Sequence, residues 1–247
     1  MLPQFNDTEI AFKHQSNHSL KQAHFLFSAM GNPLVTKLGI AATQWAFKLH
    51  LPIQSLIKNT IFKQFCGGET IDGCESTIQE LEKANIGTIL DYSVEGEESE
   101  KSFQKTKEEI LKTIRKSAEN PAIPFAVFKV TGIFQSELLE KAQTEAELNE
   151  EEQELFDHSK DLLIEICELA HALNVRLFID AEESWIQTTI DQLTYEMMAK
   201  YNQKTAIIYN TFQMYRHDML ANLTEAIEAA EAQNYYLGVK LVRGAYL

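Results

Sequence analysis

Two kinds of apolar pattern alternate along the second half of the chain. Short runs rich in β-branched and aromatic residues cover residues 88–94, 125–131, 176–180, 206–211 and 237–242, and each run predicts a strand. The segments before and between them carry apolar residues at helical spacing, and they predict helices over residues 70–84, 101–116, 159–173, 186–197 and 218–232. Strictly alternating strands and helices predict a parallel sheet that the helices cover.

The fold that this alternation favours is a (β/α) barrel. No Gly-x-Gly-x-x-Gly sequence follows any predicted strand, which disfavours a dinucleotide-binding Rossmann domain. A closed barrel needs eight strand and helix units, whereas the pattern supplies five, and the last predicted strand runs into the end of the chain at Leu247. We therefore expect an α/β fold of the (β/α)8 TIM-barrel type that is incomplete at its carboxyl end, as the front part of a longer protein.

The first 65 residues follow a different pattern. Residues 18–65 are helical and mostly apolar, and a break at residues 31–33 (Gly-Asn-Pro) predicts two or three helices. We expect a helical amino-terminal region over residues 1–65 and the partial barrel over residues 66–247. Residues 38–62 are amphipathic and carry lysines, so this piece could lie on a membrane surface. We favour packing on the main domain, because apolar stripes usually mark buried faces.

The composition narrows the function classes. A hydrophobic content of 45% is that of a globular protein. The 22 Lys and Arg against 36 Asp and Glu give a net charge of -14, which argues against a nucleic acid partner. Part of this charge lies in the Glu-rich residues 144–155, which we interpret as a solvated surface insertion. His14 and His18 have the spacing of metal ligands but no further ligand nearby, so no metal site is predicted.

The cysteines and the apolar runs bear on location. Cys66, Cys74 and Cys167 are odd in number, and Cys167 lies on the apolar side of a predicted helix, which favours a reducing, cytoplasmic compartment. The first 19 residues lack the basic start and apolar core of a secretory signal. No run of about 18 uncharged apolar residues occurs, so no membrane span is predicted, and peripheral contact with a membrane stays open.

Asp180 lies at the end of a predicted strand and directly before an acidic, helix-forming segment. In a parallel barrel or open sheet the carboxyl ends of the strands open into the ligand site, so an Asp there is a functional candidate. The alternative is that Asp180 only caps a helix that begins near Glu182. This stretch by itself leaves both interpretations open.

Polar residues also lie near the ends of the other predicted strands: Lys129, Gln213, Lys240 and Arg243. Charged side chains in β-rich runs are seldom fully buried unless they are paired or used, so we expect these four and Asp180 to converge on one mouth of the barrel. Lys129 is expected to point inward with Val127 and Thr131, and its alternative role is a structural ion pair with Asp180. Gly244 could allow the backbone to approach a bulky ligand.

Four stretches of the chain resemble the proline dehydrogenase (proline oxidase) family. They are residues 89–95, 178–183, 209–215 and 239–247, which occur in the family's order and at similar spacing. The resemblance covers residues 65–247 and is nearer to the eukaryotic-style branch than to the bifunctional bacterial one. It implies a (β/α)8 barrel that holds FAD non-covalently, oxidises L-proline to Δ1-pyrroline-5-carboxylate in proline catabolism, and passes the electrons to a membrane quinone.

The resemblance also implies roles for single residues. Lys129 would lie near the amino acid substrate with Asp180 paired to it, and Tyr246 would be an aromatic residue of the substrate pocket. Asp180 and Lys240 would be catalytic. The residues that would contact the flavin are Ala181, Gln213, Lys240, Arg243, Gly244 and Ala245.

Two positions depart from many bacterial relatives, because Lys240 stands where they have Arg beside the flavin N5 and Arg243 where they have Lys. Glu95 would belong to an acidic loop that gates the site.

Fixed cations suit this chemistry. Hydride that leaves the proline ring places negative charge on the flavin, and cations held in a site shielded from water stabilise that charge. In the resembling family the arginine pair that binds the substrate carboxylate and a lid tyrosine would lie beyond Leu247. We therefore expect the chain alone to oxidise proline poorly or not at all.

Two other hypotheses remain open. An aldolase-type barrel could use Lys129 or Lys240 to form a Schiff base with a carbonyl substrate. Alternatively, the chain is a non-catalytic barrel fragment that serves as a binding module.

Overall fold

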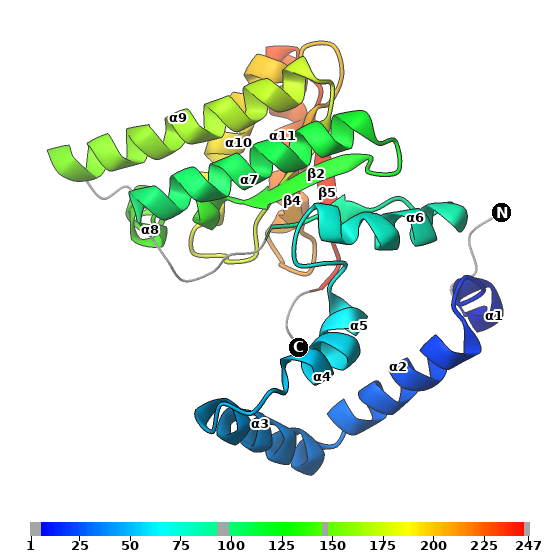
Figure 1. Ribbon diagram of the computed structural model, residues 1–247. Helices are drawn as coiled ribbons and strands as arrows, with labels where there is room; N and C mark the ends of the chain where they lie inside the picture. Colours follow the sequence, from blue (N-terminus) through cyan, green and yellow to red (C-terminus); the bar gives the residue numbers. More distant parts are fainter. Residues whose placement is uncertain (1–5, 93–98, 145–147, 245–247) are drawn as a thin grey trace. The chain divides into compact units, whose positions relative to one another are not determined.

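The computed structural model of the protein describes residues 6–92, 99–144 and 148–244 (Figure 1). The chain divides into two compact units, Met1–Ile86 and Gly87–Leu247. This division falls after Ile86, later than the boundary after residue 65 predicted from the sequence, so the helix predicted over residues 70–84 belongs to the first unit.

The first unit is helical. Its elements are α1 (Thr8–Ala11), α2 (Asn17–Met30), α3 (Pro33–Lys48), α4 (Gln54–Ile57), the π-helical turn η1 (Lys58–Phe62), α5 (Lys63–Phe65), the 3₁₀ turn η2 (Asp72–Cys74) and α6 (Glu75–Lys83). The predicted break between α2 and α3 is confirmed. Asn32 caps α3 by accepting hydrogen bonds from the backbone N–H groups of Leu34 and Val35, and Pro33 occupies the first helical turn, where a missing N–H costs nothing.

The apolar stripes of α2 and α3 are largely exposed within the first unit, and their packing on the main domain stays a prediction. No residue of α2 is buried, and Ala46 is the buried residue of α3. The exposed fraction is 75% for Phe25, 72% for Leu38 and 64% for Trp45. Among the described residues, no helix by itself has the length and apolar composition of a bilayer span, whereas α2 and α3 taken together, with a 96° bend between them, do.

The second unit contains a five-stranded parallel sheet in the order β1-β2-β3-β4-β5. The strands are β1 (Ile89–Leu90), β2 (Phe125–Lys129), β3 (Arg176–Asp180), β4 (Ile208–Gln213) and β5 (Val239–Val242). Each strand pairs with the next one along the chain. Because right-handed crossovers between sequential neighbours place every helix on the same side, this order is that of a barrel wall and not of a doubly wound sheet. The prediction of a TIM-barrel type fold is confirmed.

The helices of this unit are α7 (Glu100–Glu119), α8 (Ser136–Gln143), α9 (Glu150–Ala172), α10 (Gln187–Tyr201) and α11 (Met219–Gln233). Helix α8 was not predicted, and α9 begins at Glu150 instead of residue 159. Part of the Glu-rich segment is therefore the first turns of a helix, while residues 145–147 lie outside the described residues. Asn149 and Glu152 form a reciprocal cap there, and acidic residues in a first turn are favourable near the positive end of the helix dipole.

One face of the sheet is buried against the helices. Ala126, Phe128, Leu177, Ile179 and Ile208 point to this face, are at most 1% exposed, and belong to one apolar cluster with residues of α7, α9 and α10. Because side chains alternate along a strand, the intervening residues point to the other face, which is the interior side of a barrel. The interior face holds the candidate site.

The amino ends of β4 and β5 are held together by the hydrogen bonds of one buried side chain and by a close backbone approach. The side chain of Asn202, fully buried, donates hydrogen bonds to Ile208 O and Tyr236 O and accepts from the backbone N–H groups of Ile207 and Ile208, all at 2.8–2.9 Å. Gly238 lies so close to β4 that a Cβ on it would come within 2.2 Å of Ile208 O. The close approach explains why a residue without a side chain is needed there.

Candidate active site

Four polar residues form a row across the sheet, at the carboxyl ends of β2 and β3 and inside β4 and β5. Lys129 of β2 and Asp180 of β3 are register partners, and so are Thr211 of β4 and Lys240 of β5. Ile179 pairs with Asn210, so the next residues, Asp180 and Thr211, are also neighbours. Since residues in register on parallel strands point to the same face, all four side chains lie on the interior face of the barrel wall. The convergence predicted for Lys129, Asp180 and Lys240 is therefore seen in the register.

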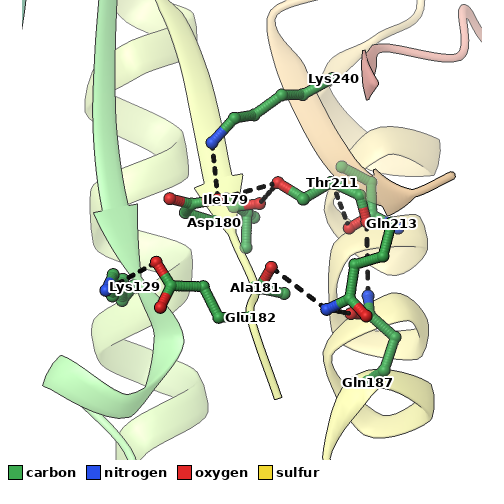
Figure 2. A network of polar contacts seen from close by, with 10 residues as sticks. Lys129, Ile179, Asp180, Ala181, Glu182, Gln187, Thr211, Gln213 and Lys240 are labelled. Carbon is green, nitrogen blue, oxygen red and sulfur yellow. Dashed lines mark hydrogen bonds and ion pairs between the residues drawn. The ribbon is translucent and has the colours of Figure 1, made fainter. Parts of the chain in front are cut away.

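The centre of the row is an ion pair between Asp180 and Lys240. Lys240 Nζ lies 2.6 Å from Asp180 Oδ1, and the hydroxyl of Thr211 lies 3.3 Å from the same oxygen and 2.9 Å from Ile179 O (Figure 2). The Asp180 side chain is 15% exposed and that of Lys240 is 29% exposed. The pair is thus partly shielded from water, which strengthens the interaction between its charges.

The second cation of the row, Lys129, forms an ion pair with Glu182. Its Nζ lies 2.9 Å from Glu182 Oε1 (Figure 2). The pairing of Lys129 with Asp180 stays a prediction, and Glu182 is a partner that was not predicted. Thr131, expected on the same strand face as Lys129, instead lies in the 3₁₀ turn η3 (Val130–Gly132), because β2 ends at Lys129.

The alternative interpretation of Asp180 as a helix cap is wrong. Residues 181–186 are not helical, and α10 begins only at Gln187 with Ile186 at its N-cap position. The segment after β3 is therefore a loop that starts at the carboxyl end of the sheet. Such loops carry the functional side chains of barrel proteins, and here the loop carries Glu182.

Gln213, at the end of β4, is held in a buried chain of amides. Gln213 is 1% exposed. Its Nε2 donates to Gln187 Oε1 at 3.0 Å and to Ala181 O at 3.4 Å (Figure 2). Gln187 in turn donates from Nε2 to Asp191 Oδ1 at 2.7 Å and to Thr211 O at 3.4 Å. Asn210 Nδ2 donates to the same Asp191 oxygen at 2.7 Å. Gln213 and Ala181 are among the residues predicted from the sequence, whereas Gln187 and Asp191 were not predicted.

Asp191 lies within a largely buried environment. Burial raises the pKa of its carboxyl above the ordinary value, and the hydrogen bonds from Asn210 and Gln187 and the positive charge of Arg216 act in the opposite direction. Arg216 itself donates from Nε to Asp218 Oδ1 at 3.0 Å. Its Nη1 is buried and has no hydrogen-bond partner among the described residues. No spacing in the sequence marks Asp191 or Arg216, because their contacts arise only when α10 packs on β4.

An aromatic cluster lies on the same face, on the amino-terminal side of the polar row. The rings of Phe125 and Phe178 stack at 4.3 Å, and the ring of Tyr209 meets each of them edge-on at 5.5 Å. The ammonium group of Lys240 lies 5.7 Å from the centre of the Phe178 ring. A cation near an aromatic face is stabilised by the ring quadrupole, so Phe178 helps to fix the position of Lys240.

Of the remaining predicted residues, the structure describes Arg243 and Gly244. Arg243 and Gly244 follow the strand directly and are exposed. A Cβ on Gly244 would meet no described atom within 4 Å, so the packing of the described residues does not require glycine there. Ala245, Tyr246 and Glu95 lie outside the described residues. Within the part of the chain that the structure describes, no group of three or more His, Cys, Asp or Glu side chains could hold a metal ion.

A parallel barrel wall with ion-paired side chains on its interior face is the class of fold that the structure defines, a (β/α)-barrel protein. The family model described as proline dehydrogenase matches residues 74–247, and the chain belongs to this family of flavin-dependent enzymes.

Two of its relatives are "Proline dehydrogenase 1, mitochondrial" of Dictyostelium discoideum, 34% identical over 238 residues, and "Carbapenem antibiotics biosynthesis protein CarD" of Pectobacterium carotovorum, 33% identical over 193 residues. The alignments cover 81% and 78% of this chain but only 42% and 50% of the relatives. The chain therefore spans about half the length of these relatives or less.

Among solved structures, the chain is similar to proline utilization A (PutA) from Bdellovibrio bacteriovorus inactivated by N-propargylglycine. The TM-score is 0.59 at 19% identity, and the match covers 77% of this chain and 21% of the other. A PutA from Bradyrhizobium japonicum matches with a TM-score of 0.52 at 17% identity, over 72% of this chain and 18% of the other. At such identities the likeness supports the fold alone.

Proposed function

We propose that the chain carries the flavin and proline site of an FAD-dependent proline dehydrogenase. The reaction is the oxidation of L-proline to Δ1-pyrroline-5-carboxylate, with a quinone as the final electron acceptor. The observation that carries this proposal is the ion pair between Asp180 and Lys240 in a row of polar residues on the interior face of the sheet. Membership in the family favours this function over the aldolase and binding-module hypotheses.

The side chains present fit a flavin. FAD offers an anionic pyrophosphate and a ring edge that gains negative charge, and both need fixed donors. Lys240 within β5 and Arg243 after it supply cations, and Gln213 supplies a buried amide. The buried Nη1 of Arg216 is a donor without a partner among the described residues. Bound there, FAD would supply the hydride acceptor of the reaction.

The protein's part in the reaction is positioning and electrostatic stabilisation. Asp180 and the ring of Phe178 hold the Lys240 ammonium in one place, so its charge does not need to reorganise when negative charge develops nearby. Lys129, directed by Glu182, lies at the neighbouring position of the row and would bind the amino acid. Arg243, Gly244 and Ala245 would contact the flavin and Tyr246 the substrate, as the family resemblance implies.

The test is flavin binding and reduction by the purified chain. We expect FAD to bind with a flavin absorption band, and the Lys240→Met variant to bind it at least about tenfold more weakly. The matched control is Lys204→Met, an exposed lysine in the connection between α10 and β4. Absence of FAD binding by the wild-type chain, or trapping of a carbonyl compound on Lys129 or Lys240 by borohydride, would contradict the proposal.

The same preparation tests the substrate. We expect slow or no flavin reduction by L-proline with the chain alone, and faster reduction when the remaining barrel segment of the Dictyostelium relative is added. Faster reduction by another amino acid than by proline under the same conditions would overturn the substrate assignment. CarD shows in its name that a relative takes part in antibiotic biosynthesis, which makes this comparison necessary.

A quinone acceptor requires contact with a membrane, and α2 and α3 supply a surface suited to it. Residues 10–68 contain no Asp or Glu, although the whole chain has a net charge of -14. They contain the lysines Lys13, Lys21, Lys37, Lys48, Lys58 and Lys63. Exposed apolar side chains together with an excess of lysine are typical of helices that lie on anionic bilayers. We therefore assign peripheral attachment to an inner membrane to this region, while the cytoplasmic location stays a prediction.

Vesicle binding tests this attachment. The chain should sediment with vesicles that contain phosphatidylglycerol and remain in solution with phosphatidylcholine alone, and salt should weaken the binding. Leu38→Glu, at a position 72% exposed in α3, should reduce binding, whereas Leu220→Glu, at a position 68% exposed in α11, should not. Equal effects of the two substitutions would contradict the assignment.

A further inference from the structure

The structure assigns a positioning role to Asp191. Through Gln187, Asp191 determines the direction of the Gln213 side-chain amide. Gln213 then presents its carbonyl oxygen Oε1 to a hydrogen-bond donor of the bound ligand. This inference rests on the proposed function, because the ligand at Gln213 is taken to be the flavin. Asp191 lies on α10, outside the polar row, and acts only through the two glutamines.

Hydrogen-bond chemistry determines which end of each amide faces Asp191. An ionised carboxylate only accepts hydrogen bonds, whereas a glutamine amide donates from one end and accepts at the other. The atom of Gln187 that faces Asp191 at 2.7 Å must therefore be its nitrogen, which leaves Gln187 Oε1 to face Gln213. The atom of Gln213 that faces Gln187 at 3.0 Å must then also be nitrogen. The carboxylate thus determines the direction of both amides.

Backbone carbonyls reinforce the same direction. The second hydrogen of the Gln187 amide points to Thr211 O and that of Gln213 to Ala181 O, each at 3.4 Å. Both amide hydrogens of Gln213 are therefore used within the protein, and among the described residues no hydrogen bond is directed to its Oε1. Gln187 and Gln213 are 2% and 1% exposed, so water does not compete for these groups.

The Asp191 carboxylate is itself held by hydrogen-bond donors and charges from three parts of the chain. Asn210 on β4 donates to the same Asp191 oxygen as Gln187. The charge of Arg216, in the loop after β4, stabilises the carboxylate, while burial and the charge of Asp218 act against it. A carboxylate with two donors and a nearby cation stays in one rotamer, which is what a fixed reference for the amide chain requires.

Hydrogen exchange at the side-chain amides tests the chain Asp191–Gln187–Gln213 without any cofactor. In the wild-type chain the side-chain NH2 hydrogens of Gln213, followed by NMR, should exchange slowly with solvent. Asp191→Leu removes the acceptor and should raise this exchange rate by about tenfold or more. Asp191→Asn keeps one carbonyl oxygen but can also turn its NH2 group inward, so it should have an intermediate effect. The matched control is Glu196→Leu, a change at an exposed carboxylate of the same helix, which should leave the rate unchanged.

Flavin affinity tests the consequence for the ligand. Asp191→Leu should weaken FAD binding by about tenfold in the wild-type background and have little further effect in a Gln213→Leu background. An equal loss in both backgrounds, or unchanged exchange at Gln213 in the Asp191 variants, overturns the inference. If Asp191→Leu does not fold, Asp191→Asn carries both comparisons. If the wild-type chain binds no FAD, the proposed function fails. The exchange measurement still decides whether Asp191 determines the direction of the Gln213 amide.

Discussion

Lys240 Nζ on β5 lies 2.6 Å from Asp180 Oδ1 on β3, so this ion pair reaches across β4. Thr211 of β4 lies between them and directs its hydroxyl toward the same carboxylate. Three strands that are distant in the sequence are thereby joined on the interior face at the end where barrel enzymes hold their ligands. The pair both ties the strands together and fixes a cation.

The Asp180–Lys240 pair should show energetic coupling. In a double-mutant cycle with Asp180→Asn and Lys240→Met, we expect a coupling of about 1–2 kcal/mol in the free energy of unfolding, because both groups are partly shielded. Urea unfolding of the four proteins measures it. The pair Lys160–Glu196, whose carboxylate side chain is 52% exposed, should give a smaller coupling. A coupling at Asp180 no larger than that of this pair would contradict the expectation.

Removing the Asn202 side chain should destabilise the second unit strongly. Asn202→Ala leaves four backbone groups without their side-chain partner, and three of them are buried. Each buried group costs about 1 kcal/mol or more, so we expect a loss of at least about 3 kcal/mol. Thermal and urea unfolding measure the loss. Gln203→Ala, at the exposed neighbouring position, is the control and should change stability little. A loss below about 1 kcal/mol for Asn202→Ala would refute the role.

Gly238 should not tolerate a side chain. In Gly238→Ala the new Cβ would meet Ile208 O at 2.2 Å, so either β5 or β4 must shift, and we expect a loss of about 2 kcal/mol or more. Gly244→Ala is the control, because a Cβ there has no described neighbour within 4 Å. The urea midpoint of each variant provides the comparison. Similar midpoints for the two variants would show that the strands adjust easily.

The pH dependence of stability should reveal Asp191. Burial raises the pKa of this carboxyl in the folded protein above its ordinary value of 3.8, so its contribution to stability is greatest below pH 3.8 and is lost as the pH rises through the folded pKa. In Asp191→Asn this loss cannot occur. The stability of the variant relative to the wild type should therefore increase with rising pH, as measured by urea unfolding from about pH 4 to 7. A constant difference across that range would contradict the shift.

The parts of the fold that the sequence predicts well depend on local periodicity. The strand that ends at Asp180 and the helix before it follow from spacing, and the strand predicted over residues 125–131 is found up to Lys129, so the register brings their side chains together. The missed element α8 has only eight residues, so its pattern is too short to stand out. The start of α9 at Glu150 was missed because its first turns carry few apolar residues, although Asn149 and Glu152 form a cap.

The choice of partners could not be predicted. Lys129 lies beside Glu182 because residues 181–186 form a loop, which helix propensity in that acidic segment did not indicate. Asp191 meets Asn210 and Gln187 only when α10 packs against β4. Such contacts depend on how elements pack in three dimensions, and no spacing within one element encodes them.

The open edge of β5 should affect the behaviour of the purified protein in solution. Among the described residues it pairs with β4 alone, and Leu241, on its helix-facing side, is 58% exposed. An unpaired strand with an apolar residue is a template for a strand from another molecule. Purified material should accordingly self-associate as its concentration rises, and a lysine in place of Leu241 should delay that association in light scattering without altering the polar row on the opposite face.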